Sequence, residues 1–466
     1  MIEENEKQPP GAMSESKSGR KRTLRPRRLK KTTSTKTTSR ATSNQVPHSA
    51  LPDEQDEANI STLVIEPPSK RKTESSSSEA TPRVEEAPTP VPPPTTPPPT
   101  PVYAEGVVEV SGKGFGFLRE AKRNFSQSHS DVFVTPEVVR KHGLRDGMKI
   151  KGETRRGSRG LQLFKLTEIE GEPPEQLRTP PIFEELTTVN PNIRITLETV
   201  PDRFTTRIMD LMTPIGRGQR GLIVAPPRTG KTTLLQHIAE AVVKNYPEMK
   251  LIILLVDERP EEVTEIRRTV PQAELMASSN DSDIKSHTRI AQLAIERAKR
   301  LVEMGKHVFV LMDSLTRIGR AFNNAQGGGG RTMSGGVDSR ALEIPRKLFA
   351  AARNTEEAGS LTIMATALID TGSRMDELIF QEFKGTGNME LVLDRKVSDQ
   401  RIYPAADIFL SGTRREELLL PPQDLHKINI IRRGLAGHKP IEAIERLLFF
   451  IRKHSSNTEM LRNIPG

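Results

Sequence analysis

Residues 221–233 read GLIVAPPRTGKTT, and a helical stretch, LLQHIAEAVVKN, follows almost directly. The apolar GLIVA segment predicts a strand. The loop after it fits the phosphate-binding pattern in all but one position, where Ala225 replaces the usual glycine. In such a loop the backbone N–H groups and the helix N-terminus surround phosphate groups. The stretch therefore predicts a nucleotide-binding site in an α/β fold.

Two residues of this loop carry specific chemistry. Lys231 is expected to contact the β- and γ-phosphate oxygens of ATP, and the Thr232 hydroxyl is expected to bind Mg²⁺. Gly230 gives the loop its shape. The predicted nucleotide-binding residues are Pro226, Pro227, Arg228, Thr229, Gly230, Lys231, Thr232 and Thr233.

Further apolar segments at 251–257, 307–313 and 361–368 alternate with longer helical stretches, which predicts a parallel α/β sheet. Apolar residues at helical spacing predict a crossover helix packed on this sheet, and they are Ile290, Leu293, Ala294, Ala298 and Leu301.

Two of these strands end in carboxylates, at the sheet edge where α/β proteins bind ligands. Asp313 closes HVFVLMD and is expected to hold Mg²⁺ through water. Glu258 could orient or deprotonate the attacking water. A structural role is the alternative for both, since either carboxylate could cap a helix or pair with Arg259.

Upstream, residues 112–120 read GKGFGFLRE in a chain that has no tryptophan and only three tyrosines. Strand alternation places Phe115 and Phe117 on one face, and KGFGF matches the start of an aromatic RNA-stacking motif. The two rings are expected to stack on unpaired bases, with Lys113 and Arg119 near the phosphates.

The segment that follows alternates short apolar strands with glycine-rich turns. Five such strands in about seventy residues predict an OB or cold-shock barrel. Phe133, two residues after Asp131, is expected to extend the binding face. The alternative is that these rings are ordinary core residues of a small barrel.

Residues 1–103 contain almost no apolar run and end in VPPPTTPPPTP, which predicts a disordered arm. Residues 17–40 carry eleven Lys and Arg and no acidic residue, so they form either a phosphate-binding polycation or a solubilising tail. The expected organisation is an arm at 1–103, a barrel at 104–172, a linker at 173–189 and the α/β domain at 190–466.

The composition limits the possible functions. The formal net charge of +10 favours a polyanionic partner, and the absence of cysteine excludes disulfides, thiolate zinc sites and cysteine nucleophiles. No apolar run approaches eighteen residues, and MIEENEKQ does not fit a signal peptide. These features predict a cytoplasmic protein.

Several long strings resemble those of the bacterial Rho transcription termination factors: TPIGRGQRGLIVAPPRTGKT, LLVDERPEEVTE, LMDSLTR, TMSGGVDS, AARNTEEAGSLTIMATALIDTGSRMDE, FKGTGNMEL and SGTRREELLL. The resemblance runs from about residue 104 to residue 450. It implies a RecA-like motor in a homohexamer, which binds ATP between subunits, moves along single-stranded RNA and acts on RNA polymerase.

The resemblance also assigns residues. Arg414 matches an arginine finger supplied by the neighbouring subunit, Arg401 matches a second arginine near the γ-phosphate, and Tyr403 matches an aromatic that stacks on adenine. Arg259 joins Lys231 and Glu258 among the catalytic residues. Two loops, 327–338 and 370–374, resemble those that grip RNA in the ring, with Arg331, Thr332 and Arg374 as the expected contacts.

The sequence also departs from the family pattern. The arm stands where Rho proteins commonly have a small helical subdomain. Gly160 falls where an aromatic would align, and Arg228 replaces a lysine in the phosphate loop, which keeps the charge but not its geometry. Two other functional hypotheses stay open. The protein could be an RNA-binding clamp that closes with ATP and hydrolyses it slowly, or a subunit of a rotary ATPase.

Removal of residues 1–100 is expected to leave a folded ATPase that RNA still stimulates, because an arm without apolar periodicity contributes to neither core. ATPase assays and RNA-binding isotherms at several salt concentrations check this expectation. A flatter salt dependence of RNA affinity would assign phosphate contacts to residues 17–40, whereas an unchanged slope would make them a solubilising tail.

Overall fold

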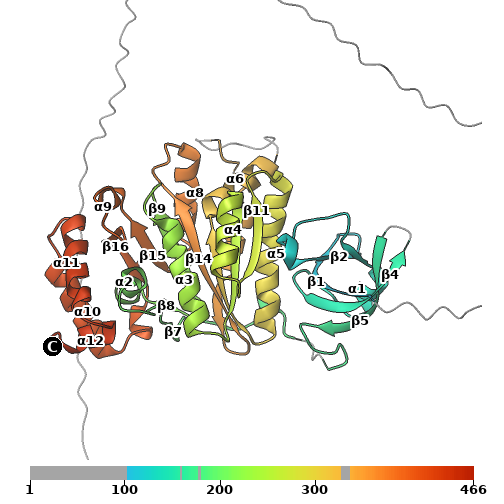
Figure 1. Ribbon diagram of the computed structural model, residues 1–466, viewed down its shortest axis with the longest axis horizontal. Helices are drawn as coiled ribbons and strands as arrows, with labels where there is room; N and C mark the ends of the chain where they lie inside the picture. The colour runs from blue at the N-terminus through green and yellow to red at the C-terminus, as the bar shows by residue number, and fades with distance from the viewer. Residues whose placement is uncertain (1–101, 158–159, 177–179, 327–335, 339, 466) are drawn as a thin grey trace, which may run out of the picture. The chain divides into compact units, whose positions relative to one another are not determined.

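The protein is described by a computed structural model that covers residues 102–157, 160–176, 180–326, 336–338 and 340–465 (Figure 1). These residues belong to one compact unit, Pro94–Gly466. It contains a small β-barrel and an α/β domain. Residues 1–101 of the predicted arm and residues 327–335 of the loop at 327–338 lie outside the described residues, and the last two residues assigned to the arm begin β1.

The barrel has five strands that close in the order β1-β2-β3-β5-β4. The expected small barrel is therefore confirmed. A short helix, α1, precedes β4. The elements are β1 Val102–Val110, β2 Gly116–Arg119, β3 Val132–Val134, α1 Pro136–Lys141, β4 Lys149–Gly157 and β5 Gly160–Ile169.

Strand alternation fills the barrel with aliphatic side chains. Leu118, Val132 and Val134 point inward from the two short strands and are buried. Inward residues of β4 and β5, such as Ile150 and Leu163, complete this core. The residues between them on each strand therefore face outward.

The segment after the barrel joins the α/β domain earlier than the expected boundary. Phe183, in a 3-10 turn at Phe183–Glu185, is fully buried in a core of that domain. Strand β6, Thr188–Val189, pairs with β13, Arg353–Thr355, at the side of the main sheet. Residues assigned to the linker thus contribute to the α/β domain.

The main sheet has the strand order β11-β10-β12-β14-β9-β15-β16. All neighbours along this path are parallel except β15 and β16. The four strands expected from sequence are confirmed. The strands are β9 Arg220–Ala225, β10 Lys250–Glu258, β11 Glu274–Ser279, β12 His307–Asp313, β14 Ser360–Leu368, β15 Met389–Leu393 and β16 Ala406–Thr413; a separate pair is β7 Arg194–Ile195 with β8 Ile215–Gly216.

Helices cover both faces of this sheet (Figure 1). Alternate residues of β9 divide between two cores, with Ile223 in one and Leu222 and Val224 in the other. The helices are α2 Phe204–Met212, α3 Lys231–Asn245, α4 Pro260–Thr269, α5 Ile284–Glu303, α6 Leu315–Ala325, α7 Glu343–Ala350, α8 Arg374–Lys384, α9 Arg395–Asp399, α10 Pro422–Leu435, α11 Pro440–Arg452 and α12 Asn457–Arg462. The predicted crossover helix is α5.

Within the described ranges, none of these helices is long and apolar enough to cross a membrane.

Candidate functional site

The phosphate-binding loop lies between β9 and α3, as the sequence predicts. It begins after Ala225, and α3 starts at Lys231. The Thr229 hydroxyl donates a hydrogen bond to the carbonyl of Pro226 at 2.8 Å, which closes the loop on itself. Gly230 precedes the helix with a φ of 82°, a conformation that favours glycine. The free N–H groups of the first turn of α3 are therefore available for phosphate.

Asp313 lies beside this loop at the carboxyl end of β12. It is buried, one oxygen accepts a hydrogen bond from the Thr366 hydroxyl at 2.7 Å, and the other pairs with the Lys231 ammonium. The side chains of Lys231, at the start of α3, and Asp313, at the end of β12, thus come together although they are far apart in the sequence. This juxtaposition is the one expected for a nucleotide and metal site.

Glu258 ends β10 and is only 3% exposed. Burial raises the pKa of its carboxyl, and the negative charge of Asp313 raises it further, although Arg317 opposes this effect. A raised pKa makes a carboxylate a better proton acceptor near neutral pH. The sequence left open that Glu258 pairs with Arg259. In the structure Glu258 instead forms an ion pair with Arg317 at 3.2 Å, and Arg259 is exposed.

Tyr403 and Arg401 lie in the segment that connects α9 to β16, and both are exposed. A side-chain carbon added to Gly230 would come within 3.3 Å of the Tyr403 ring, so this aromatic lies directly against the phosphate loop. A groove of about 1200 Å³ opens beside Arg401 and Tyr403 and is lined mostly by apolar residues of α10 and α11. A flat base can therefore be placed next to the phosphate site.

Arg414 follows β16 and is exposed. Strand β16 runs antiparallel to β15, so its last residue, Thr413, lies opposite Met389 at the start of β15. Met389 in turn lies opposite Gly221, near the start of β9. The phosphate loop follows the other end of β9, four residues or about 13 Å further along. Arg414 and Lys231 of one chain therefore belong to opposite edges of the sheet.

Phe115, Phe117 and Phe133 form one outward cluster on the barrel, which is called the phenylalanine platform below. Their ring centroids are 5.6 to 5.8 Å apart, and Phe117 lies opposite Phe133 in the strand register. All three rings, including that of Phe115, are partly exposed and stand outside the barrel core. The geometry supports a stacking platform and opposes the core alternative. Lys113 is exposed in the turn before β2.

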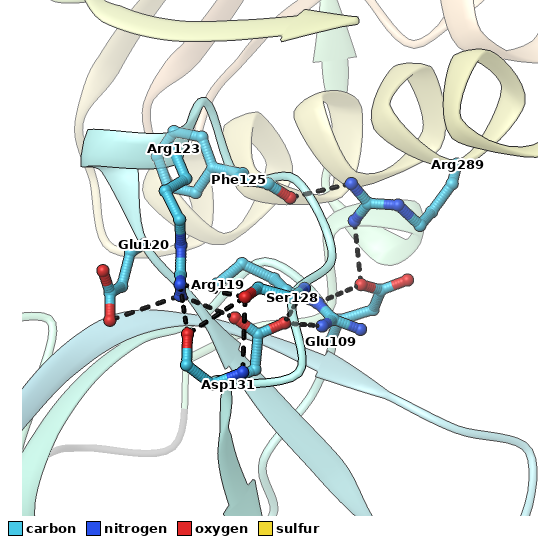
Figure 2. A network of polar contacts seen from close by, with 9 residues as sticks. Glu109, Arg119, Glu120, Arg123, Phe125, Ser128, Asp131 and Arg289 are labelled. Carbon is cyan, nitrogen blue, oxygen red and sulfur yellow. Dashed lines mark hydrogen bonds and ion pairs between the residues drawn. The ribbon is translucent and has the colours of Figure 1, made fainter. Parts of the chain in front are cut away.

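Arg119 and Asp131 are placed differently from the sequence expectation. Arg119 is 5% exposed, and its guanidinium pairs with Asp131 and, at 2.6 Å, with Glu109 (Figure 2). Its charge is already balanced by two carboxylates, which argues against the expected phosphate contact. Instead, the guanidinium carbon of Arg119 lies 5.1 Å from the Phe117 ring centroid, so Arg119 packs against this ring of the platform.

The second predicted RNA loop lies at the same sheet edge as the phosphate loop. Arg374 begins α8 and is exposed. The turn before it is fixed by Asp376, which accepts a hydrogen bond from the Thr371 hydroxyl at 2.6 Å and pairs with Arg320. Arg331 and Thr332 of the first loop lie outside the described residues.

Comparison with known proteins agrees with both parts of this geometry. Residues 104–175 match the Rho termination factor RNA-binding domain family, and residues 205–413 match the ATP synthase alpha/beta family, nucleotide-binding domain. Transcription termination factor Rho of Aquifex aeolicus is 49% identical over 78% of this chain and 84% of its own. For Rho of Cereibacter sphaeroides the identity is 50%, over 77% and 86% of the two chains. This chain belongs to the Rho family.

A solved structure of the ATPase EscN from the type III secretion system of enteropathogenic E. coli shares the fold, with a TM-score of 0.51 and 20% identity over 65% of this chain and 76% of that one. The family matches, rather than this likeness in fold, identify the chain as an ATP-hydrolysing enzyme with a RecA-like domain and an RNA-binding barrel. Sequence reasoning missed Arg317 as the partner of Glu258, although its place four residues after Asp313 was a signal.

Sequence reasoning also missed how this Rho chain connects its barrel to α5. Arg289 of α5 donates hydrogen bonds to the Glu109 carboxylate at 2.9 Å and to the Phe125 carbonyl at 2.7 Å (Figure 2). Phe125 is 2% exposed and packs in a core of the α/β domain. Burial lowers the pKa of Arg289, and Glu109 offsets part of this effect. The stacking platform thus reaches α5 through Arg119 and Glu109.

The substitution Arg289→Ala is expected to loosen the segment 121–131, because the Phe125 carbonyl and the Glu109 carboxylate both lose a charged donor. Hydrogen bonds to charged groups contribute roughly 1.5 to 3 kcal/mol each. Hydrogen–deuterium exchange should therefore rise in this segment and in β1.

Lys299→Ala is the control, because Lys299 is also on α5 but pairs with the partly exposed Glu184 and Glu296. It should leave exchange in residues 121–131 unchanged. Equal exchange in both variants, or no change with Arg289→Ala, would contradict the role given to Arg289.

Proposed function

We propose that the protein is an ATP-dependent RNA translocase and helicase that captures nascent single-stranded RNA and terminates transcription by RNA polymerase. The observation that carries this proposal is the presence, in one compact unit, of an outward phenylalanine platform on a Rho-type barrel and a complete phosphate site. The proposed organisation keeps the predicted arm, barrel and α/β domain, but it assigns residues 183–189 of the predicted linker to the α/β domain. We place the protein in the cytoplasm, where transcripts are made.

RNA capture is assigned to the platform. Unpaired bases stack on Phe115, Phe117 and Phe133, at about 1 to 3 kcal/mol per base. Lys113 is exposed beside them and supplies positive charge for the backbone. Arg119 and Asp131 contribute indirectly, because their ion pair holds together the strands that carry Phe117 and Phe133.

Hydrolysis of ATP is assigned to the carboxyl edge of the sheet. Lys231 binds the β- and γ-phosphate oxygens, and the N–H groups of the first α3 turn hold the remaining phosphate oxygens. Glu258 accepts a proton from the attacking water or orients it, and its raised pKa suits this role near neutral pH. Tyr403 stacks on the adenine, since it already lies against Gly230.

Magnesium fits the residues present. Thr232 supplies a hydroxyl oxygen at the start of α3, and Asp313 supplies a carboxylate that already holds one cation, the Lys231 ammonium. Oxygen donors of this kind suit Mg²⁺, which keeps several waters and is shared with substrate phosphates. Bound there, the ion would neutralise charge on the phosphates that are cleaved.

One of the proposed catalytic arginines, Arg414, requires a neighbouring subunit. Arg414 lies at the edge of the sheet opposite its own phosphate loop, so it can serve only the site of another chain. Arg401 and Arg259 are exposed and available near the γ-phosphate. This arrangement supports a closed ring, and we assign it to a homohexamer. Arg374, together with Arg331 and Thr332, grips the RNA that passes through the ring.

The substitution Arg414→Ala is expected to preserve ATP binding and assembly but to abolish hydrolysis, because an arginine finger is worth roughly 10³ to 10⁵ in rate. Lys231→Ala protein should also be inactive, yet it should retain RNA capture in filter binding. Mixing the two variants should restore part of the ATPase activity, since a chain that keeps Lys231 can use Arg414 of a neighbour.

Fluorescent labelling of the two variants confirms that subunits exchange. Persistent inactivity in mixed rings would show that Arg414 does not act between subunits. Full activity of Arg414→Ala alone would remove this residue from the catalytic set.

A further inference from the structure

A second exposed aromatic lies on the barrel, outside the phenylalanine platform. Phe164, on β5, is 48% exposed, and the Arg155 guanidinium carbon of β4 lies 3.0 Å from the centroid of its ring. The inward residues of β5, Leu163 and Leu166, fill the core without it. Phe164 and Arg155 therefore lie outside the barrel core.

The strand register connects this pair to the platform. Phe117 lies opposite Phe133, Phe133 lies opposite Gln162, and Gln162 lies opposite Arg155. Residues aligned across neighbouring strands share one face, and these four are all at least partly exposed. Neighbouring strands are about 4.8 Å apart, so Arg155 lies about 10 Å beyond Phe133 on the same outer surface.

Strands β4 and β5 form a hairpin, and the charges near Phe164 differ from those at the end of the hairpin that contains Lys149 and Lys151. Lys149 pairs with Glu105, and Lys151 pairs with Glu168 at 2.9 Å. Arg155 lies over Phe164, Arg156 follows Arg155 on β4, and Lys165 follows Phe164 on β5. All three are exposed, and no ion pair links any of them to another described residue. Among the described residues of β4 and β5, the positive side chains without an ion pair are therefore Arg155, Arg156 and Lys165, although Glu153 lies opposite Lys165 in the strand register.

We propose that Phe164 and Arg155 form a second RNA subsite, which holds the nucleotides that continue from the phenylalanine platform. The guanidinium of Arg155 lies over the Phe164 ring and offers its outer face to a base, while its N–H groups and those of Arg156 and Lys165 bind phosphate oxygens. The subsite lengthens the RNA path across the barrel surface. It rests on the proposed capture of RNA by the platform.

The test measures the affinity of full-length protein for fluorescent oligocytidylates of about 4 and about 10 nucleotides, lengths within the range of OB-fold site sizes. Phe164→Ala and Arg155→Ala should weaken binding of the longer oligomer about fivefold or more and leave the shorter one unchanged. Phe164→Tyr keeps the aromatic face and should restore the affinity.

Lys151→Ala is the matched control for Arg155→Ala, because Lys151 is on the same strand but its charge is paired with Glu168. It should affect neither oligomer. Circular dichroism confirms that each variant is folded, as expected for exposed side chains.

Wild-type affinity of Phe164→Ala for the longer oligomer would overturn the subsite, and so would equal weakening for both lengths. The proposed function fails by a different result: Phe117→Ala would leave binding of the shorter oligomer unchanged. The two failures are therefore distinguishable in one experiment.

Discussion

The ion pair between Glu109 and Arg289 is the contact that attaches the phenylalanine cluster of the barrel to helix α5. Glu109 holds Arg119 beneath Phe117, and Arg289 belongs to the helix that packs against the sheet. Two more arginine contacts reinforce this attachment, from Arg297 to Glu170 at 2.5 Å and from Arg145 to Glu303 at 2.6 Å. Buried charges are tolerated only when they are paired, so these contacts favour one arrangement of the barrel on α5.

Sheet topology imposes the second constraint. The phosphate loop follows the carboxyl end of a parallel strand, whereas the antiparallel β16 carries Arg414 to the opposite edge. One chain therefore holds Lys231, Asp313 and Glu258 together but cannot bring its own Arg414 to them. In the proposed ring, a neighbouring subunit would supply Arg414 to each site.

The sequence predicted well those features that depend on local order. The phosphate loop, the carboxylate at the end of β12 and the alternation of Phe115 and Phe117 are each encoded within about ten residues. The pairing of Arg119 with Glu109 and Asp131 was not predictable, because it joins three strands and depends on the barrel register. Likewise, β11, β15 and β16 were missed, and Arg289 gave no local signal of its contact with Glu109.

A RecA-like domain alone does not distinguish an RNA motor from a rotary ATPase, and EscN shares this fold. The barrel makes the difference, because its outward phenylalanines have no role in the packing of its core. One chain therefore carries both the exposed phenylalanine cluster and the nucleotide site.

The most direct test of this account compares the steady-state ATPase rate of the full-length protein with cytidine-rich RNA, with single-stranded DNA of the same sequence and length, and without nucleic acid. The account predicts strong stimulation by RNA and little hydrolysis in its absence. An ATPase rate that is the same in all three conditions would contradict it.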